Sequence, residues 1–274
     1  MTGDLLLGVD CGTGGCKVSA ITHSGSVVAS FSEEYPTSHP QPGWAEQNPA
    51  DWYPALIACL RQVWASGRVS AARITALAFD GSTHNAVLLD AGLRPLRPVI
   101  MWTDQRSVAE AAWLEQNHGD EIFRIGYQRP TPTWTLSQMR WLQQHEPEVM
   151  GRISRVLFVK DYVRYLVTGE MCSDHVDAQG TLFFDMARSR WSPELCALAG
   201  IPLSALPAVV KPAQLAGRVT KQAAAETGLL AGTPVVCGSS DTAAEAYAAG
   251  AVEPGQCIVK LATAGNVNLM TDAA

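Results

Sequence analysis

Short apolar runs in the N-terminal third of the chain predict β-strands. Leu5–Val9 is a continuous apolar run, which is typical of a buried strand. Lys17–Thr22 alternates polar and apolar residues, as a strand with one buried face does. Because short turns separate the first three runs, we expect those strands to be antiparallel neighbours. The predicted strands are Leu5–Val9, Lys17–Thr22, Ser26–Phe31, Ile74–Phe79 and Ala86–Leu89.

A helix is predicted between the third and fourth of these strands. Pro49–Trp52 opens it and places a carboxylate near its N-terminus, where the helix dipole favours negative charge. Three strands, a helix and a further strand form the order of a ribonuclease H-like core, so we expect an α/β fold of that class. Apolar residues at helical spacing support the helix: Leu56, Cys59, Leu60, Val63 and Trp64.

The remainder of the chain alternates helical and strand-like segments. A mostly helical section is expected from Gln105 to about Leu166, with a break at Pro130–Pro132. An alanine-rich helix is expected over Thr242–Ala251. Short strands are expected at Gly180–Phe184, at Gly217–Thr220, within Thr233–Gly238, and on both sides of a turn within Gln256–Val267.

The final strand, turn and strand repeat the pattern at the start of the chain. This internal similarity indicates that a second, related domain begins near Ala251. The length of 274 residues fits one large domain or two smaller ones. We therefore expect a first domain over residues 1–250 and only the beginning of a second over residues 251–274.

Composition and charge narrow the class of protein. Hydrophobic residues make up 47% of the chain and charged residues 17%, which excludes a disordered chain. A formal net charge of −6 without a Lys/Arg cluster argues against a nucleic-acid partner. The seven scattered cysteines form no C-x-x-C pair and suit reduced thiols. With no signal peptide and no apolar run of membrane-spanning length, the chain is expected to be soluble and cytoplasmic.

A glycine-rich turn between the first two predicted strands, Cys11–Cys16, is a candidate anion site. It has neither the Rossmann G-x-G-x-x-G pattern nor the P-loop G-K-[ST], and it leads into a strand instead of a helix. Its backbone N–H groups and the Thr13 hydroxyl can face a phosphate. Asp10 beside them could hold Mg²⁺. The alternative is a plain β-hairpin with a solvated Asp10.

Asp241 is a candidate catalytic carboxylate. It ends a predicted strand and precedes a helix, where an open α/β sheet presents its ligand-facing groups. A helix N-terminus lowers the pKa of a carboxylate, so Asp241 is expected to be ionised and able to accept a hydroxyl proton or bind a cation. The alternative is an ordinary N-cap at Ser239–Asp241, with Ser240 and Thr242 as capping residues.

Two further polar segments follow apolar runs. Phe79–Asn85 carries several polar groups, among them His84, which is either a ligand contact or a structural histidine. In Met101–Arg106, the indole of Trp102 suits the C–H groups of a sugar and Asp104 suits its hydroxyls. The alternative places Trp102 in the core and makes Asp104 an N-cap. The absence of zinc motifs and of a G-x-S-x-G elbow argues against structural zinc and against an α/β-hydrolase.

Taken together and in this order, these segments resemble the FGGY carbohydrate kinases, and within that family its xylulokinase-like members. The resemblance covers essentially the whole chain. It implies the actin/hexokinase type of ribonuclease H-like fold. The matching segments are Asp10–Thr13 with Lys17, Gln41–Gln47, Gly81–Asp90, Trp102–Arg106 and Gly238–Asp241.

The resemblance also implies a reaction, the transfer of the γ-phosphate of ATP to a sugar hydroxyl. The expected substrate is a pentulose such as D-xylulose. Asp241 would be the catalytic base, and Asp10 would hold Mg²⁺. The nucleotide phosphates would lie against Gly12, Thr13, Lys17, Thr263 and Gly265, and Thr83, His84, Trp102, Asp104 and Thr242 would line the sugar pocket.

The chain departs from the family pattern at three places. Ser82–Asn85 stands where xylulokinases usually have Gln-Met-His-Gly, Gln138 replaces the Lys of a Lys-x-x-Trp signature, and Thr242 follows the catalytic Asp. A kinase for another ketose or for a polyol is therefore an alternative.

Family members carry a second domain of similar kind that holds most of the adenosine pocket, and it is almost wholly absent from this sequence. We therefore expect a sugar-binding lobe that is not a competent kinase by itself. A non-catalytic sugar-binding fragment and an actin-like ATPase are further alternatives. Family members are often dimers, so a homodimer also stays open.

Overall fold

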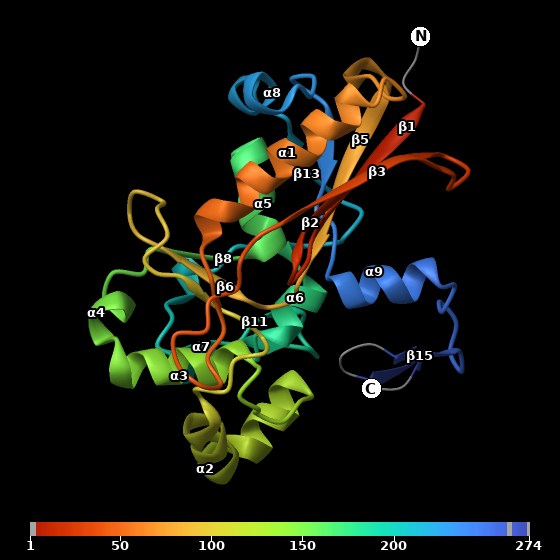
Figure 1. Ribbon diagram of the computed structural model, residues 1–274. Helices are drawn as coiled ribbons and strands as arrows, with labels where there is room; N and C mark the ends of the chain where they lie inside the picture. The colour runs from red at the N-terminus through yellow and green to blue at the C-terminus, as the bar shows by residue number, and fades with distance from the viewer. Residues whose placement is uncertain (1–3, 262–264, 273–274) are drawn as a thin grey trace.

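A mixed six-stranded β-sheet forms the framework of the protein. The computed structural model describes residues 4–261 and 265–272. Strands β1, β2 and β3 are antiparallel neighbours (Figure 1), whereas β5 and β14 run parallel to β1. In sheet order the strands are β13 (Leu215–Arg218), β14 (Pro234–Val236), β5 (Ile74–Gly81), β1 (Leu5–Cys11), β2 (Gly15–Thr22) and β3 (Val27–Glu34).

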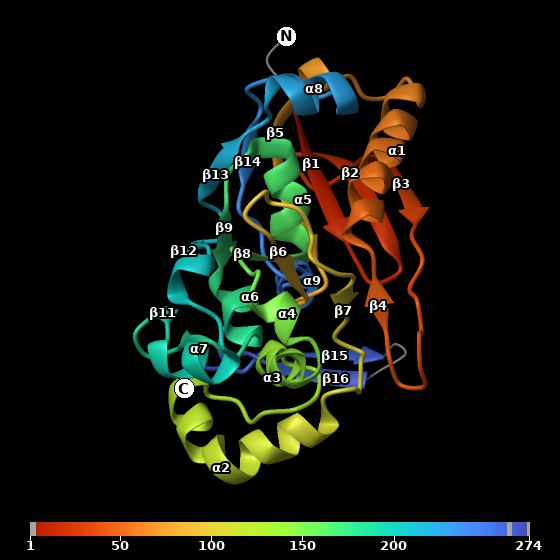
Figure 2. The same cartoon turned by 90° about the vertical axis from the view of Figure 1, so that its left-hand side faces the viewer.

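The first three strands and their antiparallel pairing are confirmed. Alternating apolar residues give β1 and β2 a buried face. In β1, Leu5, Leu7 and Val9 are each at most 1% exposed. Helices α1 (Trp52–Ala65), α5 (Val159–Thr168) and α8 (Lys221–Thr227) pack together beside this sheet, as Figure 2 shows. The helix predicted from Pro49 is therefore also confirmed, although its first residues, Pro49–Asp51, form a 3-10 turn.

A second, mostly helical layer has its own hydrophobic core, at the end of the molecule opposite α8 (Figure 1). Its helices are α2 (Val108–Gly126), α3 (Thr135–His145), α4 (Pro147–Met150), α6 (His175–Gly180) and α7 (Pro193–Ala199). Short strand pairs join the two layers: β4 (Glu46–Gln47) with β7 (Val99–Ile100), β6 (Ala86–Leu89) with β8 (Arg155–Phe158), and β9 (Cys172–Asp174) with β12 (Ala208–Val210). A further pair, β10 (Phe184–Asp185) with β11 (Arg190–Trp191), lies within the helical layer.

The section from Gln105 to Leu166 is mostly helical with a break around Pro130–Pro132, as predicted. It also contains strand β8, which was not expected, since Val156–Phe158 is a short buried apolar run that pairs with β6. One expectation for this layer is wrong. The strand expected over Gly180–Phe184 is largely absent, because α6 runs up to Gly180 and β10 begins only at Phe184. Asp174 caps α6 by accepting the backbone N–H of Val176 at 2.9 Å, which stabilises a helix there.

The C-terminal segment forms a separate antiparallel hairpin of β15 (Cys257–Leu261) and β16 (Gly265–Leu269). It lies beside α9 (Asp241–Ala248) and away from the six-stranded sheet (Figure 1). The predicted strands within Gln256–Val267 are therefore confirmed, whereas the division into two domains stays a prediction. In residues 4–261 and 265–272, none of the helices has the length and apolar character needed to span a bilayer.

Candidate active site

Three carboxylates gather where adjacent parallel strands end. Asp10 in β1 and Asp80 in β5 are register partners, so their side chains lie side by side near the carboxyl ends of these strands. Strand β14 is the next neighbour of β5, and the chain passes from it into α9, which starts at Asp241 and contacts β5. The topology therefore places a helix N-terminus and its carboxylate beside the Asp10–Asp80 pair.

Burial raises the pKa of all three carboxyl groups. For Asp80 the pKa rises to about 8, because burial and the neighbouring charge of Asp10 both disfavour ionisation. Burial is also the main reason for the raised pKa values of Asp10 and Asp241. The expectation that the helix N-terminus lowers the pKa of Asp241 is therefore wrong: the hydrogen bonds from Thr242 favour the ionised form, but burial outweighs them.

The turn after Asp10 is held by side chains from three other segments. The Tyr35 hydroxyl donates to the Gly12 carbonyl, and Gln47 Nε2 donates to the Thr13 carbonyl at 2.6 Å. Trp102 Nε1 donates to Thr13 Oγ1 at 3.0 Å. A Cβ atom on Gly15 would lie 2.5 Å from the Glu33 carbonyl oxygen, so only glycine fits where this turn enters β2. These contacts fix the turn with the Thr13 side chain directed at Trp102.

The start of α9 depends on a close backbone approach. Gly238 has φ +77°, and a Cβ atom there would lie 1.7 Å from the Phe79 carbonyl oxygen. Glycine is therefore required for the chain to cross β5 and deliver Asp241 to the site. Ser240 is the N-cap, with its side chain accepting the N–H of Ala243 at 3.2 Å, so the capping role falls to Ser240 and leaves Asp241 in the first turn.

His84 is a neutral, fully enclosed imidazole. It is 6% exposed, its ring centroid lies 4.9 Å from that of Trp134, and burial lowers its pKa to about 3. Its backbone has φ 52°, and its N–H donates to Asp177 Oδ1 at 2.8 Å. The Nδ1 atom of His84 is buried without a hydrogen-bond partner. A buried ring nitrogen without a partner is uncommon in proteins, and a polar ligand that enters beside the ring would satisfy it. Thr83 beside it is half-buried.

The Trp102–Arg106 segment contains one exposed aromatic side chain, Trp102, and one buried ion pair, Asp104 with Arg106. Trp102 is 37% exposed, so it does not belong to the core. Asp104 is 1% exposed and accepts from the Ala45 N–H at 2.6 Å and from Arg106 Nε and Nη2 at 2.9 and 2.8 Å. The guanidinium of Arg106 lies over the Trp44 ring, 3.7 Å from its centroid. Helix α2 takes Ser107, and not Asp104, as its N-cap.

The three other predicted phosphate-binding residues are Lys17, Gly265 and Thr263, and of these Lys17 adjoins the Asp10–Asp80 pair. Lys17 is the cross-strand partner of Asp10, and its side chain is exposed. Gly265 is the first residue of β16. Thr263 lies outside the described residues.

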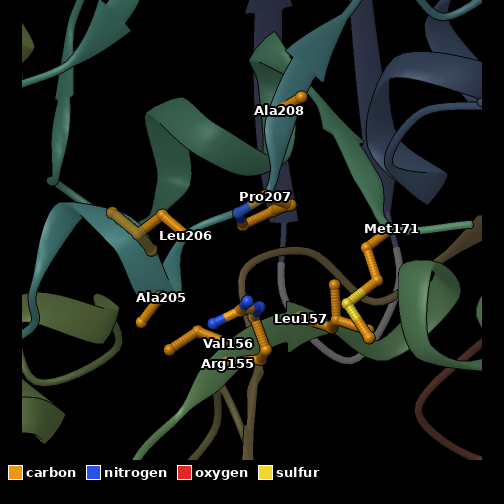
Figure 3. Close-up of a pocket in the computed structure, with 8 residues that line it drawn as sticks. All are labelled: Arg155, Val156, Leu157, Met171, Ala205, Leu206, Pro207 and Ala208. Carbon is orange, nitrogen blue, oxygen red and sulfur yellow. The ribbon is translucent and has the colours of Figure 1, made fainter.

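Sequence reasoning missed two residues of this site. Asp80 stands at the end of a predicted strand, but its pairing with Asp10 follows from the parallel register of β1 and β5. Gln47 belongs to a segment already singled out, yet nothing local indicates that its side chain reaches Thr13. A surface hollow with a volume of about 160 Å³ lies elsewhere, between β8 and β12. Its lining, drawn in Figure 3, includes none of the predicted site residues.

Magnesium suits the residues present. The Oδ1 atoms of both Asp10 and Asp80 are buried without a hydrogen-bond partner, and Mg²⁺ is usually bound by one or two carboxylates plus phosphate oxygens and water. Across residues 4–261 and 265–272, no group of three or more His, Cys, Asp or Glu side chains could hold a metal ion by itself. The described residues therefore suit a cation that arrives with a phosphorylated ligand.

Comparisons with solved structures confirm the fold. Xylulose kinase from Rhodospirillum rubrum superposes with a TM-score of 0.93 at 33% identity, over 98% of this chain and 56% of that one. A xylulose kinase from Brucella ovis gives a TM-score of 0.89 at 36% identity, over 96% of this chain and 54% of that one. The actin/hexokinase type of α/β fold expected from the sequence is therefore correct.

Comparisons of sequence identify the family. The chain is 35% identical to the xylulose kinase of Escherichia coli K12 over 95% of its own length and 53% of that protein. It thus spans about half the length of the curated relatives it matches. Residues 5–248 match the family described as "FGGY family of carbohydrate kinases, N-terminal domain". On this evidence the chain belongs to the FGGY family of carbohydrate kinases.

Proposed function

We propose that the protein containing this chain transfers the γ-phosphate of ATP to a hydroxyl of a pentulose such as D-xylulose. The observation that carries this proposal is the position of Asp241, in the first turn of α9 beside the Asp10–Asp80 pair. Relatives named as xylulose kinases, at 33–35% identity over 95% of the chain, support the choice of sugar.

Asp241 acts as the base in this proposal. Its carboxylate accepts the proton of the sugar hydroxyl as that oxygen attacks the γ-phosphate. A raised pKa makes Asp241 a stronger base, and it therefore suits this role as long as the group is ionised at the working pH. Phosphoryl transfer has a loose transition state, so the correct placement of Asp241 matters more than its basicity.

The phosphates lie against the turn in the same proposal. The backbone of Gly12 and the Thr13 hydroxyl contact the phosphate oxygens, while Lys17 adds positive charge at the edge of the turn. Asp10 and Asp80 hold Mg²⁺, which when bound neutralises the phosphate charge that develops during transfer. The contributions of Thr263 and Gly265 to this site stay predictions.

The sugar lies between His84 and Trp102. The free Nδ1 of His84 bonds a sugar hydroxyl, and the exposed indole of Trp102 covers C–H groups. Thr83 and Thr242 are half-buried, and in this proposal their hydroxyls complete the contacts to the sugar. Because the described contacts of Asp104 go to protein groups, we propose that it supports the pocket wall through Arg106.

The choice between sugars rests on the segment Ser82–Asn85. Since it departs from the pattern usual in xylulokinases, another ketose or a polyol is the second candidate substrate. The chain covers about half of its relatives, so a further lobe would supply the rest of the adenosine site. A cytoplasmic location and a homodimer stay expectations of the same proposal.

The experiment is an assay of the full-length protein with Mg-ATP against pentuloses, hexuloses and polyols, with ADP release and sugar phosphate measured together. The proposal expects both products in equal amounts with D-xylulose. Equal amounts of ADP and sugar phosphate with a different ketose or polyol would keep the sugar-kinase activity and change only the assigned substrate. ADP release that no sugar stimulates would support the actin-like ATPase instead.

A further inference from the structure

A cluster of five buried charged side chains lies under the site and takes no part in the proposed chemistry. Each side chain is at most 2% exposed. The Nζ atom of Lys160 lies 2.6 Å from Asp161 Oδ1 and 2.8 Å from both Asp174 Oδ2 and Asp177 Oδ2. Arg164 Nη1 pairs with Asp161 Oδ1 at 2.9 Å. Helices α5 and α6 and strand β9 are thus joined through one ammonium group.

The cluster reaches the site on two sides. On one side, Asp177 Oδ1 accepts the backbone N–H of His84 at 2.8 Å. On the other side, Asp174 Oδ1 accepts the Ser239 hydroxyl at 3.0 Å, two residues before Asp241. Arg164 adds a hydrogen bond to the Cys237 carbonyl at 2.6 Å. The sugar-binding loop and the approach to the proposed base are therefore held by one network.

Stability alone does not account for so many buried charges. Well-packed apolar side chains of similar volume often stabilise a core as well as a buried ion pair does, because desolvation offsets the attraction. The cluster has two cations and three carboxylates, so it is not electrically balanced. What it supplies is fixed geometry, since an ion-paired carboxylate with both oxygens bonded has little freedom to move.

We propose that Asp177 and Lys160 are positioning residues for the reaction: Asp177 fixes the backbone of His84, and Lys160 holds Asp177 in register with Asp174 and thus with Ser239. The kinetic consequence of this inference rests on the proposed function. A shift of the His84 loop relative to Asp241 misplaces the sugar hydroxyl, which lowers turnover without affecting the nucleotide. Burial raises the pKa of Asp177 to about 6, and the Lys160 ammonium opposes this rise.

Two substitutions at Asp177 separate the hydrogen bond from the charge. Asp177→Asn keeps an oxygen for the His84 N–H and gives up the carboxylate that faces Lys160, whereas Asp177→Ala gives up both. In the full-length protein we expect kcat/KM for D-xylulose to fall at least ~10-fold for Asp177→Ala and by a clearly smaller factor for Asp177→Asn, which keeps the acceptor for His84 but turns its amide NH2 towards Lys160. The KM for ATP should stay within about 2-fold in both variants.

A measurement that needs no substrate accompanies the kinetics. Hydrogen exchange of the segments around His84 and Ser239 should accelerate in Asp177→Ala at His84, and in Lys160→Met at both places. Leu56→Ala is the matched control, because it opens a cavity in the core at α1 without touching the cluster. It should lower Tm and leave kcat/KM and the exchange of both segments unchanged.

Equal kcat/KM and equal exchange at His84 for Asp177→Asn and Asp177→Ala would overturn the inference. A loss of activity in Leu56→Ala matching that of Asp177→Ala at the same drop in Tm would overturn it too, because the effect would then be general destabilisation. If wild type does not phosphorylate D-xylulose, the proposed function fails, and the exchange data still decide whether Asp177 positions His84. If Lys160→Met does not fold, the comparison of Asp177→Asn with Asp177→Ala alone tests the inference.

Discussion

Trp102 Nε1 donates a hydrogen bond to Thr13 Oγ1 at 3.0 Å, and this bond joins the two sides of the site. Trp102 belongs to the proposed sugar wall, and Thr13 belongs to the turn proposed to hold the phosphates. Since the indole is 37% exposed, a sugar lying on its face also touches the group that orients Thr13. Occupancy of the sugar site and the geometry of the phosphate turn are thereby connected through one hydrogen bond.

Trp102→Phe should separate stacking from this hydrogen bond. The phenyl ring still covers the sugar, so the KM for sugar should change by less than about 3-fold, while kcat should fall about 5-fold for the loss of roughly 1 kcal/mol. Steady-state kinetics of Trp102→Phe, Thr13→Val and the double variant would measure the coupling. Strictly additive effects would show that the bond carries no coupling.

Gln47→Leu should disorder the phosphate turn. Gln47 is 2% exposed, donates to Thr13 and Thr37, and accepts from the Trp52 indole at 3.1 Å. Leucine leaves the Thr13 carbonyl and the indole N–H without partners, which costs about 2–4 kcal/mol of unfolding free energy. Denaturant unfolding would measure this loss, with the exposed Gln116→Leu as control. A loss below about 0.5 kcal/mol would contradict the role given to Gln47.

His84 should make the protein less stable in acid. Its folded-state pKa of about 3 lies below its ordinary value of 6.5, so the unfolded chain binds more protons between these values. The contribution of His84 to stability is therefore present above pH 6.5 and is lost as the pH falls towards 3. Unfolding free energies between pH 7 and pH 4 should fall more steeply in wild type than in His84→Asn, by up to about 1.4 kcal/mol per pH unit. Identical slopes would show that His84 is not buried as a neutral ring.

Gly238→Ala should prevent normal folding around the site. A methyl group at this position meets the Phe79 carbonyl, and φ +77° is strained for alanine. We expect a loss of about 3 kcal/mol or more in unfolding free energy. Gly232→Ala is the control, since it has a similar φ of +87° but open space around its Cβ position. Equal losses in the two variants would show that the approach of Gly238 to β5 is not as close as described.

Elements that depend on the local pattern of apolar residues were predicted correctly from the sequence. Leu5–Val9 and Lys17–Thr22 carry alternating or continuous apolar patterns, and both became strands. Strand β8 was not foreseen because Val156–Phe158 is short and runs directly into α5, so periodicity alone could not separate it from a helix. In the Gly180–Phe184 segment, the N-cap at Asp174 favours helix α6, which runs to Gly180, so that only Phe184 of the apolar run lies in a strand.

The site was less accessible from sequence, because its geometry depends on distant pairings. Asp10 and Asp241 stand beside recognisable turns, and the local pattern singled them out. Asp80 acquires its partner only through the register between β1 and β5. Lys160, Asp161 and Arg164 of the buried cluster lie on α5. Charged residues on a helix ordinarily indicate a side that faces solvent, and these three are buried only because α6 and β9 pack against α5. The burial of Asp104 in a hydrogen-bonded pair with Arg106 likewise depends on the fold.

The assignment of Asp241 as the base is tested most directly by Asp241→Asn in the full-length protein, with phosphoryl transfer and sugar binding measured on the same preparation. Asparagine keeps the side-chain oxygen that accepts from Thr242, so α9 should remain intact. Glu253→Gln, an exposed change of the same kind, is the control. We expect kcat to fall at least ~10²-fold with D-xylulose bound within about 3-fold of wild type. Unchanged turnover in Asp241→Asn would contradict the account.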